Sequence, residues 1–498
     1  MSTVLSRRPG NPGPVEHVVD AGEIRRSVLG LAWPSILENF MQAALGFITT
    51  LMVARLGSAA VAGVGTASQV QVIVITAFFA VSMGTTVLIA HAFGAGRIDT
   101  EGDAIVKQST IAGLILALVL TPLTVLLAAP VMRGLGAEPD VVSEGAKFLQ
   151  ITSLSFIFMA IMFILSGALR GVGDTRTSMV VTAFMNVINI ALVYALVFGF
   201  LFIPELGVTG AALAMVFSRG VGAAIMWLLL WQGRRGLTIS GRDGWKLNWQ
   251  RLKRLADIGL PSMGESVLRS GGQIVFVIVV FMLGTAVTAG NQVAQNAMFL
   301  SMFPGFGFSM AATSLVGQSL GARNPERARK VGMTATRWCL AWMSAMGVIF
   351  FVFAHPIMEF AASGDDKAAI VTAGVDALRL IAFIQPPLAI GFVMAGILRG
   401  AGDTRFPMYS TSLTMWLLRV PLAYLFGVVF DWGLQGIYVA MMLDTVVLMV
   451  MNLWRYRQGD WMMRNLAGTE DDEEATPVAT PISSRVEDAE PAPATVGR

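Results

Sequence analysis

Long apolar stretches alternate with short polar gaps along almost the whole chain. Each stretch has about the 20 residues that an α-helix needs to cross the hydrocarbon core of a bilayer. Glycine, proline and charged residues gather in the gaps, as at 55–57 and 171–176. The pattern predicts twelve membrane-spanning helices, at residues 27–53, 59–91, 104–130, 144–169, 178–202, 208–232, 254–283, 286–320, 331–355, 370–398, 406–430 and 434–456.

A twelve-residue segment after the fourth span is repeated after the tenth. Residues 165–176 return as residues 394–405, at an offset of 229 positions, and both copies keep Arg-Gly-x-Gly-Asp-Thr-Arg. We call them the RGxGDTR motifs. Further matches hold register along both halves, at offsets of 226 and 227 positions. Six spans per half give the two halves the same orientation, so a pseudo-twofold axis along the membrane normal relates them.

The expected fold is therefore an all-α integral membrane protein with twelve transmembrane helices in two pseudo-twofold-related six-helix lobes. A central cavity between the lobes is the expected place for a substrate. The acidic end of the chain is rich in proline, alanine and threonine and is expected to be disordered. The predicted divisions are a cytoplasmic tail at 1–25, the first lobe at 26–232, a cytoplasmic linker at 233–253, the second lobe at 254–457 and an acidic tail at 458–498.

Basic residues are unevenly distributed among the gaps. Arginine and lysine concentrate in the even-numbered gaps and in the linker, whereas aspartate and glutamate prevail in the others. Positively charged loops stay on the cytoplasmic side of a membrane. The first 25 residues lack the apolar core of a signal peptide. We therefore expect a multi-pass protein of a bacterial-type inner membrane, with both termini cytoplasmic.

Composition narrows the class of function. The chain is 55% hydrophobic and 13% charged, against about 25% charged residues in soluble proteins, so it belongs in lipid. Its net charge of +3 gives no sign of a nucleic-acid partner. Cys339 is the only cysteine, and no metal-ligand, nucleophile or ATP-binding motif is present. We expect no cofactor and no enzyme activity, but a monomer whose partners are small-molecule substrates and membrane lipid.

The charged residues that we single out inside predicted spans are Glu38, Glu265, Arg269, Arg419 and Asp444. A charge at the bilayer centre costs at least about 2.5 kcal/mol. Glu38 and Glu265 occupy one repeat position, four residues after Pro34 and Pro261. They are predicted to face a shared cavity as proton or cation sites, and Arg269 joins them as a predicted substrate- or ion-coupling residue. The alternative is that each is a structural partner of a nearby arginine, since Arg269 follows Glu265 at helical neighbour spacing.

Arg419 and Asp444 are expected to form an ion pair in the second lobe. Arg419 lies 13 residues before Trp432, which centres the last interhelical turn, and Asp444 lies 12 residues after it. At a rise of about 1.5 Å per residue, both lie about 18–20 Å from the outer surface. A structural clamp and a role in ion coupling both fit this depth.

Polar amides inside spans are further candidates. They either line the cavity or join helices through hydrogen bonds. The predicted set is Asn186, Asn189, Gln292, Gln295, Asn296 and Gln385.

The RGxGDTR motifs, the paired prolines and the amide segments at 186–189 and 292–296 resemble the multidrug and toxic compound extrusion (MATE) family. The resemblance covers about residues 25–457. It implies efflux of amphiphilic, often cationic, compounds in exchange for H⁺ or Na⁺ by alternating access.

The chain departs from the family where the resemblance implies coupling acids. Thr49, Val193 and Leu388 stand at those positions, so coupling must use other residues, with Glu38 and Glu265 as candidates. A lipid-linked oligosaccharide flippase of a related fold is the nearest alternative, although two acidic residues favour cationic cargo. A membrane scaffold or an enzyme is the alternative from another class; a scaffold would show no transport in vesicles.

Overall fold

The computed structural model describes residues 21–463 except 135, 137, 200–203, 235, 242–243 and 362–366. Of the predicted tails at 1–25 and 458–498, residues 1–20 and 464–498 lie outside the described residues. The described residues form helices and turns and contain no β-strand. Eleven of their helices are long and apolar enough to cross a membrane, and a bent helix pair raises the number to twelve.

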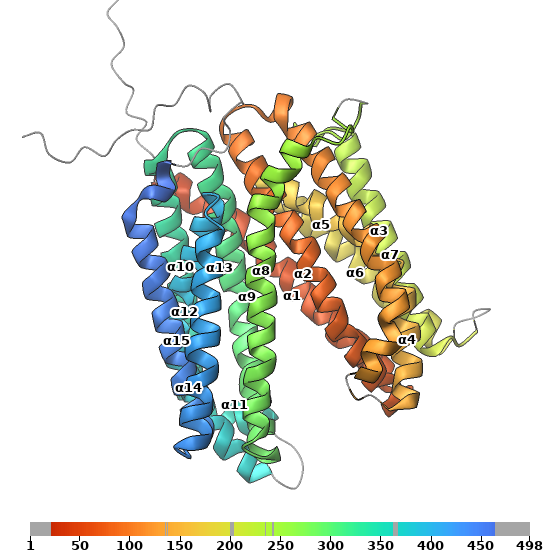
Figure 1. Ribbon diagram of the computed structural model, residues 1–498, viewed down its shortest axis with the longest axis vertical. Coiled ribbons are helices and arrows are strands. Elements are labelled where there is room, and N and C mark those ends of the chain that lie inside the picture. Colours follow the sequence, from red (N-terminus) through yellow and green to blue (C-terminus); the bar gives the residue numbers. More distant parts are fainter. Residues whose placement is uncertain are drawn as a thin grey trace, which may run out of the picture. The chain divides into compact units, whose positions relative to one another are not determined.

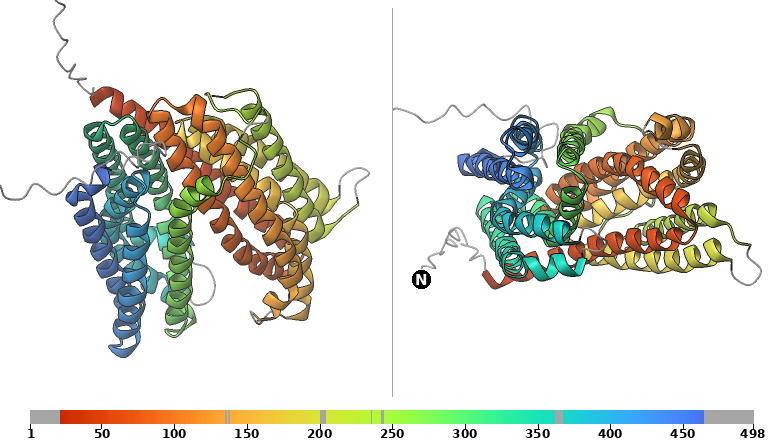
Figure 2. Two further views of the ribbon diagram at one scale, coloured as in Figure 1. Left: turned by 45° about the horizontal axis from the view of Figure 1, so that its top comes forward. Right: turned by 90° about the horizontal axis from the view of Figure 1, so that it is seen from below.

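The first lobe holds the helices of residues 21–231, which Figures 1 and 2 show grouped on one side of the molecule except for the start of the first helix, which lies among the helices of the second half. Its helices are α1 (Ala21–Ala54), α2 (Ser58–Gly94), η1 (Ile98–Gly102), α3 (Asp103–Gly134), α4 (Pro139–Ser153), α5 (Phe156–Gly171), α6 (Thr175–Phe198) and α7 (Gly207–Trp231). The predicted fourth span is the pair α4 and α5, bent by 54° at the break between them.

The second lobe repeats this order. Its helices are α8 (Trp249–Phe281), α9 (Thr285–Gly321), α10 (Pro325–Val352), α11 (Ala354–Ala361), α12 (Lys367–Gly400), α13 (Arg405–Leu413), η2 (Thr414–Arg419), α14 (Val420–Tyr424), η3 (Leu425–Val429), α15 (Gly433–Gln458) and η4 (Asp460–Met463). The predicted eleventh span runs from α13 to η3 and contains two π-helical turns, η2 and η3.

The RGxGDTR motif is a helix end, a tight turn and a helix start in one segment. In the first copy, Gly173 has φ +83°, a left-handed conformation that glycine adopts without steric cost. The Asp174 carboxylate then accepts the Thr177 backbone N–H at 3.2 Å and caps α6. Gly402 takes the same left-handed conformation in the second copy. The shared left-handed turn explains why both copies keep glycine at this position.

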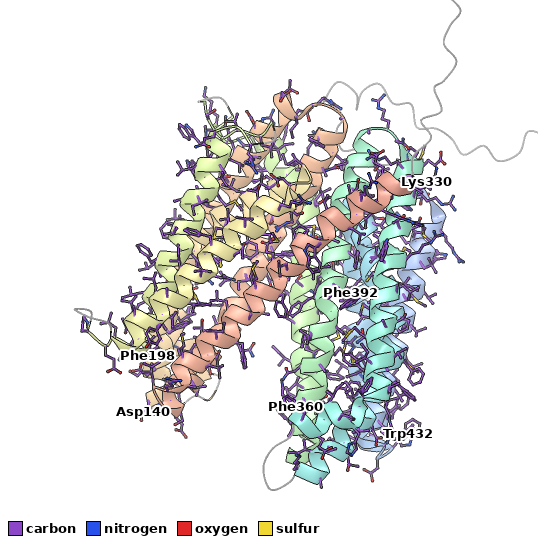
Figure 3. The ribbon with its side chains drawn as sticks, turned by 180° about the vertical axis from the view of Figure 1, so that it is seen from behind. Asp140, Phe198, Lys330, Phe360, Phe392 and Trp432 are labelled. Atoms are coloured by element: carbon purple, nitrogen blue, oxygen red, sulfur yellow. The ribbon has the colours of Figure 1, made fainter. Side chains whose placement is uncertain are left out.

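The first helix of each lobe packs against the opposite lobe before it joins its own. Ile24, Val28 and Ala32 of α1 belong to the hydrophobic core formed by the second-lobe helices. In Figure 3, α1 runs diagonally from the region of Lys330 to that of Asp140. In the same way, Leu255 and Ile258 of α8 pack with buried residues of α2. The two lobes are thus interlocked by their first helices.

Candidate functional site

Glu38 lies in α1 just past the stretch that packs against the second lobe. It is 7% exposed. Its Oε1 accepts the hydroxyls of Ser178 at 3.0 Å and of Thr182 at 3.4 Å, both from α6. Nη1 of Arg170, from the first RGxGDTR motif, lies 3.9 Å from the same oxygen. The carboxylate is therefore held mainly by hydroxyl groups, with an arginine at the limit of ion-pair distance.

Glu265 occupies the equivalent position in α8 and is 4% exposed. Arg399, the counterpart of Arg170, donates from Nη2 at 2.6 Å and from Nε at 3.3 Å to its two oxygens. Thr411, the counterpart of Thr182, donates at 3.4 Å. The second glutamate is thus clamped by a bidentate arginine, the strong form of this pair.

The two glutamates are each held inside their own lobe, and the shared cavity expected from their repeat position stays a prediction. Each is buried, and its hydrogen-bond and ion-pair partners among the described residues all come from its own lobe. The physical reason is that each RGxGDTR motif supplies an arginine, Arg170 or Arg399, at the depth of the glutamate. Sequence reasoning placed these arginines in loops and missed them as partners.

Arg269 is the helical neighbour expected to pair with Glu265. It is half-buried and lies within electrostatic range of Glu265, Arg399 and Arg419. Within the part of the chain that the structure describes, no carboxylate lies within 4.0 Å of it and no hydrogen bond engages its guanidinium. Arg399 takes the place that the sequence assigned to Arg269.

Arg419 and Asp444 form an ion pair in the second lobe. Arg419, the last residue of the π-turn η2, donates from Nε to Asp444 Oδ2 at 2.7 Å. Asp444 is 1% exposed. The equivalent first-lobe residues are Asn189 and Ser218, and the Asn189 amide donates to the Ser218 hydroxyl at 2.8 Å. One site in the repeat therefore carries a neutral pair in one lobe and a charged pair in the other.

The remaining amide candidates are spread over different environments. Asn186 donates to the Met41 carbonyl at 3.0 Å, and Gln385 donates to the Ser301 hydroxyl at 2.8 Å. Both join neighbouring helices. Three amide oxygens are buried with no partner in the described structure: Asn186 Oδ1, Asn189 Oδ1 and Gln385 Oε1.

The three candidate amides in α9 differ in their exposure. Gln295 is buried, whereas Gln292 and Asn296 are exposed and bonded to each other at 3.3 Å. The predicted set of amides is therefore not gathered into one cluster.

Arg219, at the middle of α7, was not singled out from the sequence. It is half-buried, and its Nη1 donates to the Ser155 hydroxyl at 2.8 Å, at the break between α4 and α5. Its position inside a predicted span could have marked it as a candidate residue, because charged residues are rare inside membrane spans.

The lobes are joined by two reciprocal hydrogen bonds at the end that carries the RGxGDTR motifs. His91 in α2 bonds through Nε2 to the Gly400 carbonyl of the second lobe at 2.9 Å. Gln318 in α9 donates to the Gly171 carbonyl of the first lobe at 2.7 Å. His91 and Gln318 are 227 positions apart, as are Glu38 and Glu265. We call this pair of bonds the interlobe clasp.

Close backbone approach makes the clasp possible. A side chain on Gly94 would collide with the Gln318 carbonyl, and one on Gly321 would collide with the His91 carbonyl. Gly94 and Gly321 are also repeat equivalents. Glycine is needed at both positions because the ends of α2 and α9 cross in contact.

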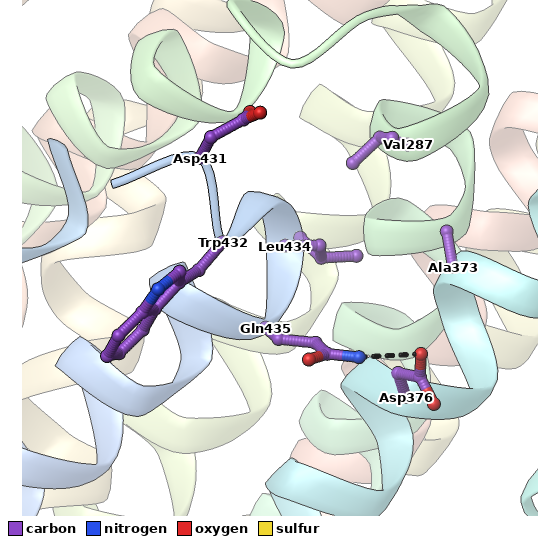
Figure 4. A pocket seen from close by; sticks show the side chains of 7 residues that line it. All are labelled: Val287, Ala373, Asp376, Asp431, Trp432, Leu434 and Gln435. Atoms are coloured by element: carbon purple, nitrogen blue, oxygen red, sulfur yellow. Dashed lines mark hydrogen bonds between the residues drawn. The ribbon is translucent and has the colours of Figure 1, made fainter. Parts of the chain in front are cut away.

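A pocket of about 370 Å³ opens at the far end of the second lobe from the RGxGDTR motif. Asp376 and Gln435 bond across it at 2.9 Å, and Asp431 and Trp432 lie at its rim (Figure 4). No predicted site residue lines this pocket. The described residues also hold no cluster of three or more metal-ligating side chains.

Curated relatives are similar over nearly their whole length. A probable multidrug resistance protein NorM of Thermotoga maritima is 32% identical, with 89% of this chain and 94% of the relative covered. An uncharacterized transporter YisQ of Bacillus subtilis is 28% identical, with 89% and 96% covered. The multidrug resistance protein MdtK of Photorhabdus laumondii is 25% identical, with 87% and 96% covered.

Solved structures agree in fold. A MATE transporter in the bent conformation has a TM-score of 0.82 at 22% identity, over 92% of this chain and 98% of that one. A MOP superfamily transporter from Pyrococcus furiosus, described as having a binding pocket of reverse polarity, has a TM-score of 0.80 at 22% identity, over 88% and 97%. The MatE family model matches residues 34–195 and 261–425, one match in each lobe. The chain therefore belongs to the MatE family of multidrug efflux transporters, membrane proteins rather than enzymes.

Proposed function

We propose that this protein exports amphiphilic organic compounds in exchange for H⁺ or Na⁺ by alternating access. It works as a monomer in a bacterial-type inner membrane, with both termini cytoplasmic. MATE transporters are cation-coupled antiporters that use no cofactor. The observation that carries the proposal for this chain is the buried Glu38 carboxylate, held by two hydroxyl groups and only loosely by an arginine.

Glu38 is the better coupling residue of the two glutamates. Its neighbours Ser178 and Thr182 are hydroxyls, which donate to a carboxylate and accept from a protonated carboxyl group. A proton or Na⁺ at Glu38 competes with a weak contact at 3.9 Å. At Glu265 it competes with two hydrogen bonds from Arg399. Glu265 therefore serves mainly to hold α8 to the second RGxGDTR motif, with a smaller part in coupling.

Alternating access requires the interlobe clasp to open. The clasp closes the end where the basic loops lie, which is the cytoplasmic end by the positive-inside rule. Ion binding at Glu38 weakens its tie to Arg170 in the same motif whose Gly171 accepts the bond from Gln318. Coupling thus has a short physical path from the ion site to the clasp.

Dye efflux from proteoliposomes tests this proposal. The purified chain is reconstituted, and efflux of a fluorescent amphiphile is recorded with a pH gradient alone and with a sodium gradient alone. One gradient should drive efflux, and Glu38→Gln should remove the response while Glu265→Gln weakens it. Absence of gradient-driven efflux in the wild type, at normal folding, would refute the antiporter.

The flippase alternative predicts a different result. A lipid-linked oligosaccharide flippase would move a lipid-linked pyrophosphate between leaflets and leave the dye inside the vesicle. Parallel assays on the same reconstituted protein therefore separate the two functions.

A further inference from the structure

The charges at mid-membrane in the second lobe do not balance. Two ion pairs are present there, Glu265 with Arg399 and Arg419 with Asp444. Arg269 lies within electrostatic range of both pairs, and it adds a third positive charge to two negative ones. The group of five residues, which we call the α8 charge cluster, has one positive charge in excess.

Arg269 is placed where an uncompensated charge is expensive. It lies 12 residues before Phe281, the last residue of α8, which puts it about 18 Å from that end of the helix. A guanidinium at such a depth needs an anionic or strongly polar neighbour. Among the residues with described side chains, its neighbours in electrostatic range are one carboxylate already taken by Arg399 and two further arginines.

The Arg269 head group is also not sealed inside the protein. No described residue forms a hydrogen bond with its nitrogens. None of these nitrogens is among the fully buried polar atoms that lack a hydrogen-bond partner. They therefore reach accessible space. The residue shares one face of α8 with Glu265, four positions earlier, and this face is turned away from the exposed Val267. The space that Arg269 reaches must accept charge, which lipid tails do not.

The sign of the α8 charge cluster decides what binds there. Adding H⁺ or Na⁺ would raise its excess from one positive charge to two, whereas a monoanionic group would neutralise it. Arginine also binds carboxylates and phosphates through two parallel hydrogen bonds. The cluster is thus suited to an anion, while the loosely paired Glu38 of the first lobe remains available for the coupling cation.

We infer that Arg269 binds an anionic group of the exported compound, so that the cargo is an anionic or zwitterionic amphiphile rather than a purely cationic one. This inference rests on the proposed export function. It revises the expectation of cationic cargo, which assumed that Glu38 and Glu265 were uncompensated. Both have an arginine neighbour.

A matched pair of dyes tests the inference. Rhodamine B carries a free carboxylate beside its cationic ring system, and in its ethyl ester a neutral ester group replaces that carboxylate. Wild-type protein should bind and export rhodamine B in preference to the ester. Arg269→Gln should lower the affinity for rhodamine B about tenfold or more, as expected for a lost charge-assisted hydrogen bond. It should do so far more than for the ester, and Arg269→Lys should recover part of the loss.

Arg219→Gln is the matched control, because Arg219 is also a half-buried arginine in a span, but in the first lobe. It should leave the preference between the dyes unchanged. Equal losses for both dyes in Arg269→Gln, at normal thermal stability, would show a structural role and overturn the inference. A preference that disappears in the Arg219 variant instead would overturn it too.

The source of the anion is separated by lipid composition. Binding is repeated in phosphatidylcholine vesicles with and without phosphatidylglycerol. If phosphatidylglycerol displaces rhodamine B from the wild type, the site is a lipid-headgroup site and the assignment to cargo fails. If rhodamine B binds equally in both, the assignment to cargo holds. A wild type that exports neither dye under any gradient would instead reject the proposed function itself.

Discussion

The two lobes share a backbone plan but differ in how they hold their buried charges. In the first lobe, the Arg170–Glu38 distance is 3.9 Å and Asn189 bonds to Ser218. In the second lobe, Arg399 donates to Glu265 at 2.6 Å, and the charged pair of Arg419 and Asp444 takes the place of the neutral Asn189–Ser218 pair. The first lobe holds its carboxylate mainly by hydroxyl groups. The second lobe pairs Glu265 and Asp444 with arginines and keeps a further, half-buried arginine, Arg269, beside them.

Removing the loose carboxylate should have the largest effect on transport. Glu38→Gln keeps the hydrogen bonds from Ser178 and Thr182 but cannot take up an ion. We expect gradient-driven efflux to fall to the background of protein-free vesicles, with folding preserved. Efflux that survives in Glu38→Gln and vanishes in Glu265→Gln would reverse the roles of the two lobes.

Breaking the charged pair of the second lobe should cost the most stability. Arg419→Ala leaves Asp444 buried and unpaired, which typically costs about 3–5 kcal/mol. Thermal unfolding in detergent would measure the loss. Adding Asp444→Ala should recover part of it in a double-mutant cycle. Strictly additive losses would mean that the two charges have other partners.

Giving the second lobe the chemistry of the first should be better tolerated than breaking its pair. Arg419→Asn combined with Asp444→Ser recreates the amide–hydroxyl pair of Asn189 and Ser218. Replacing a buried ion pair as a whole is often close to neutral, so we expect a stability change within about 1 kcal/mol. The double variant should also leave the excess charge around Arg269 unchanged, because it removes one positive and one negative charge. A loss as large as that of Arg419→Ala alone would show that the lobes are not interchangeable at this site.

The smallest effect is expected at the interlobe clasp. His91→Gln reproduces the residue of the second lobe, because Gln318 makes the equivalent bond, and should transport like the wild type. His91→Leu should lose one hydrogen bond of about 1 kcal/mol and shift the population of the open state about fivefold. Distances between spin labels on the cytoplasmic ends of α2 and α9, in a Cys339→Ser background, would measure the shift. Equal distances in both variants would mean that the bond does not hold the lobes together.

Sequence predicted the fold well because membrane length and the internal repeat are strong signals. All twelve spans have a helical counterpart. Arg419 and Asp444 were expected to meet because opposite charges at one depth seek each other, and the structure bonds them. The partners of the two glutamates were not predictable in this way, since Arg170 and Arg399 lie at span ends and reach inward by their long side chains.

Two backbone features also lay beyond the sequence. The 54° bend between α4 and α5 falls at Leu154 and Ser155, where no proline or glycine marks a break. The π-turn η2 adds one residue to the second lobe, so that Asn189 aligns with Arg419 at an offset of 230 positions. Neither leaves a signature in hydropathy, because the residues involved remain apolar on their lipid-facing side.

The two hydrogen bonds of the interlobe clasp are reciprocal, which is consistent with an origin of the two lobes as separate chains. His91 reaches Gly400 while its equivalent, Gln318, reaches Gly171, so each half offers a donor and an acceptor at the same repeat positions. This is the contact pattern of an isologous interface, in which one surface meets its own copy across a twofold axis. Both acceptors are backbone carbonyls, which no substitution removes. A homodimer of half-length chains could thus have closed by the same bonds, and after fusion its two copies were free to diverge, as Glu38 and Glu265 have in how closely an arginine holds them.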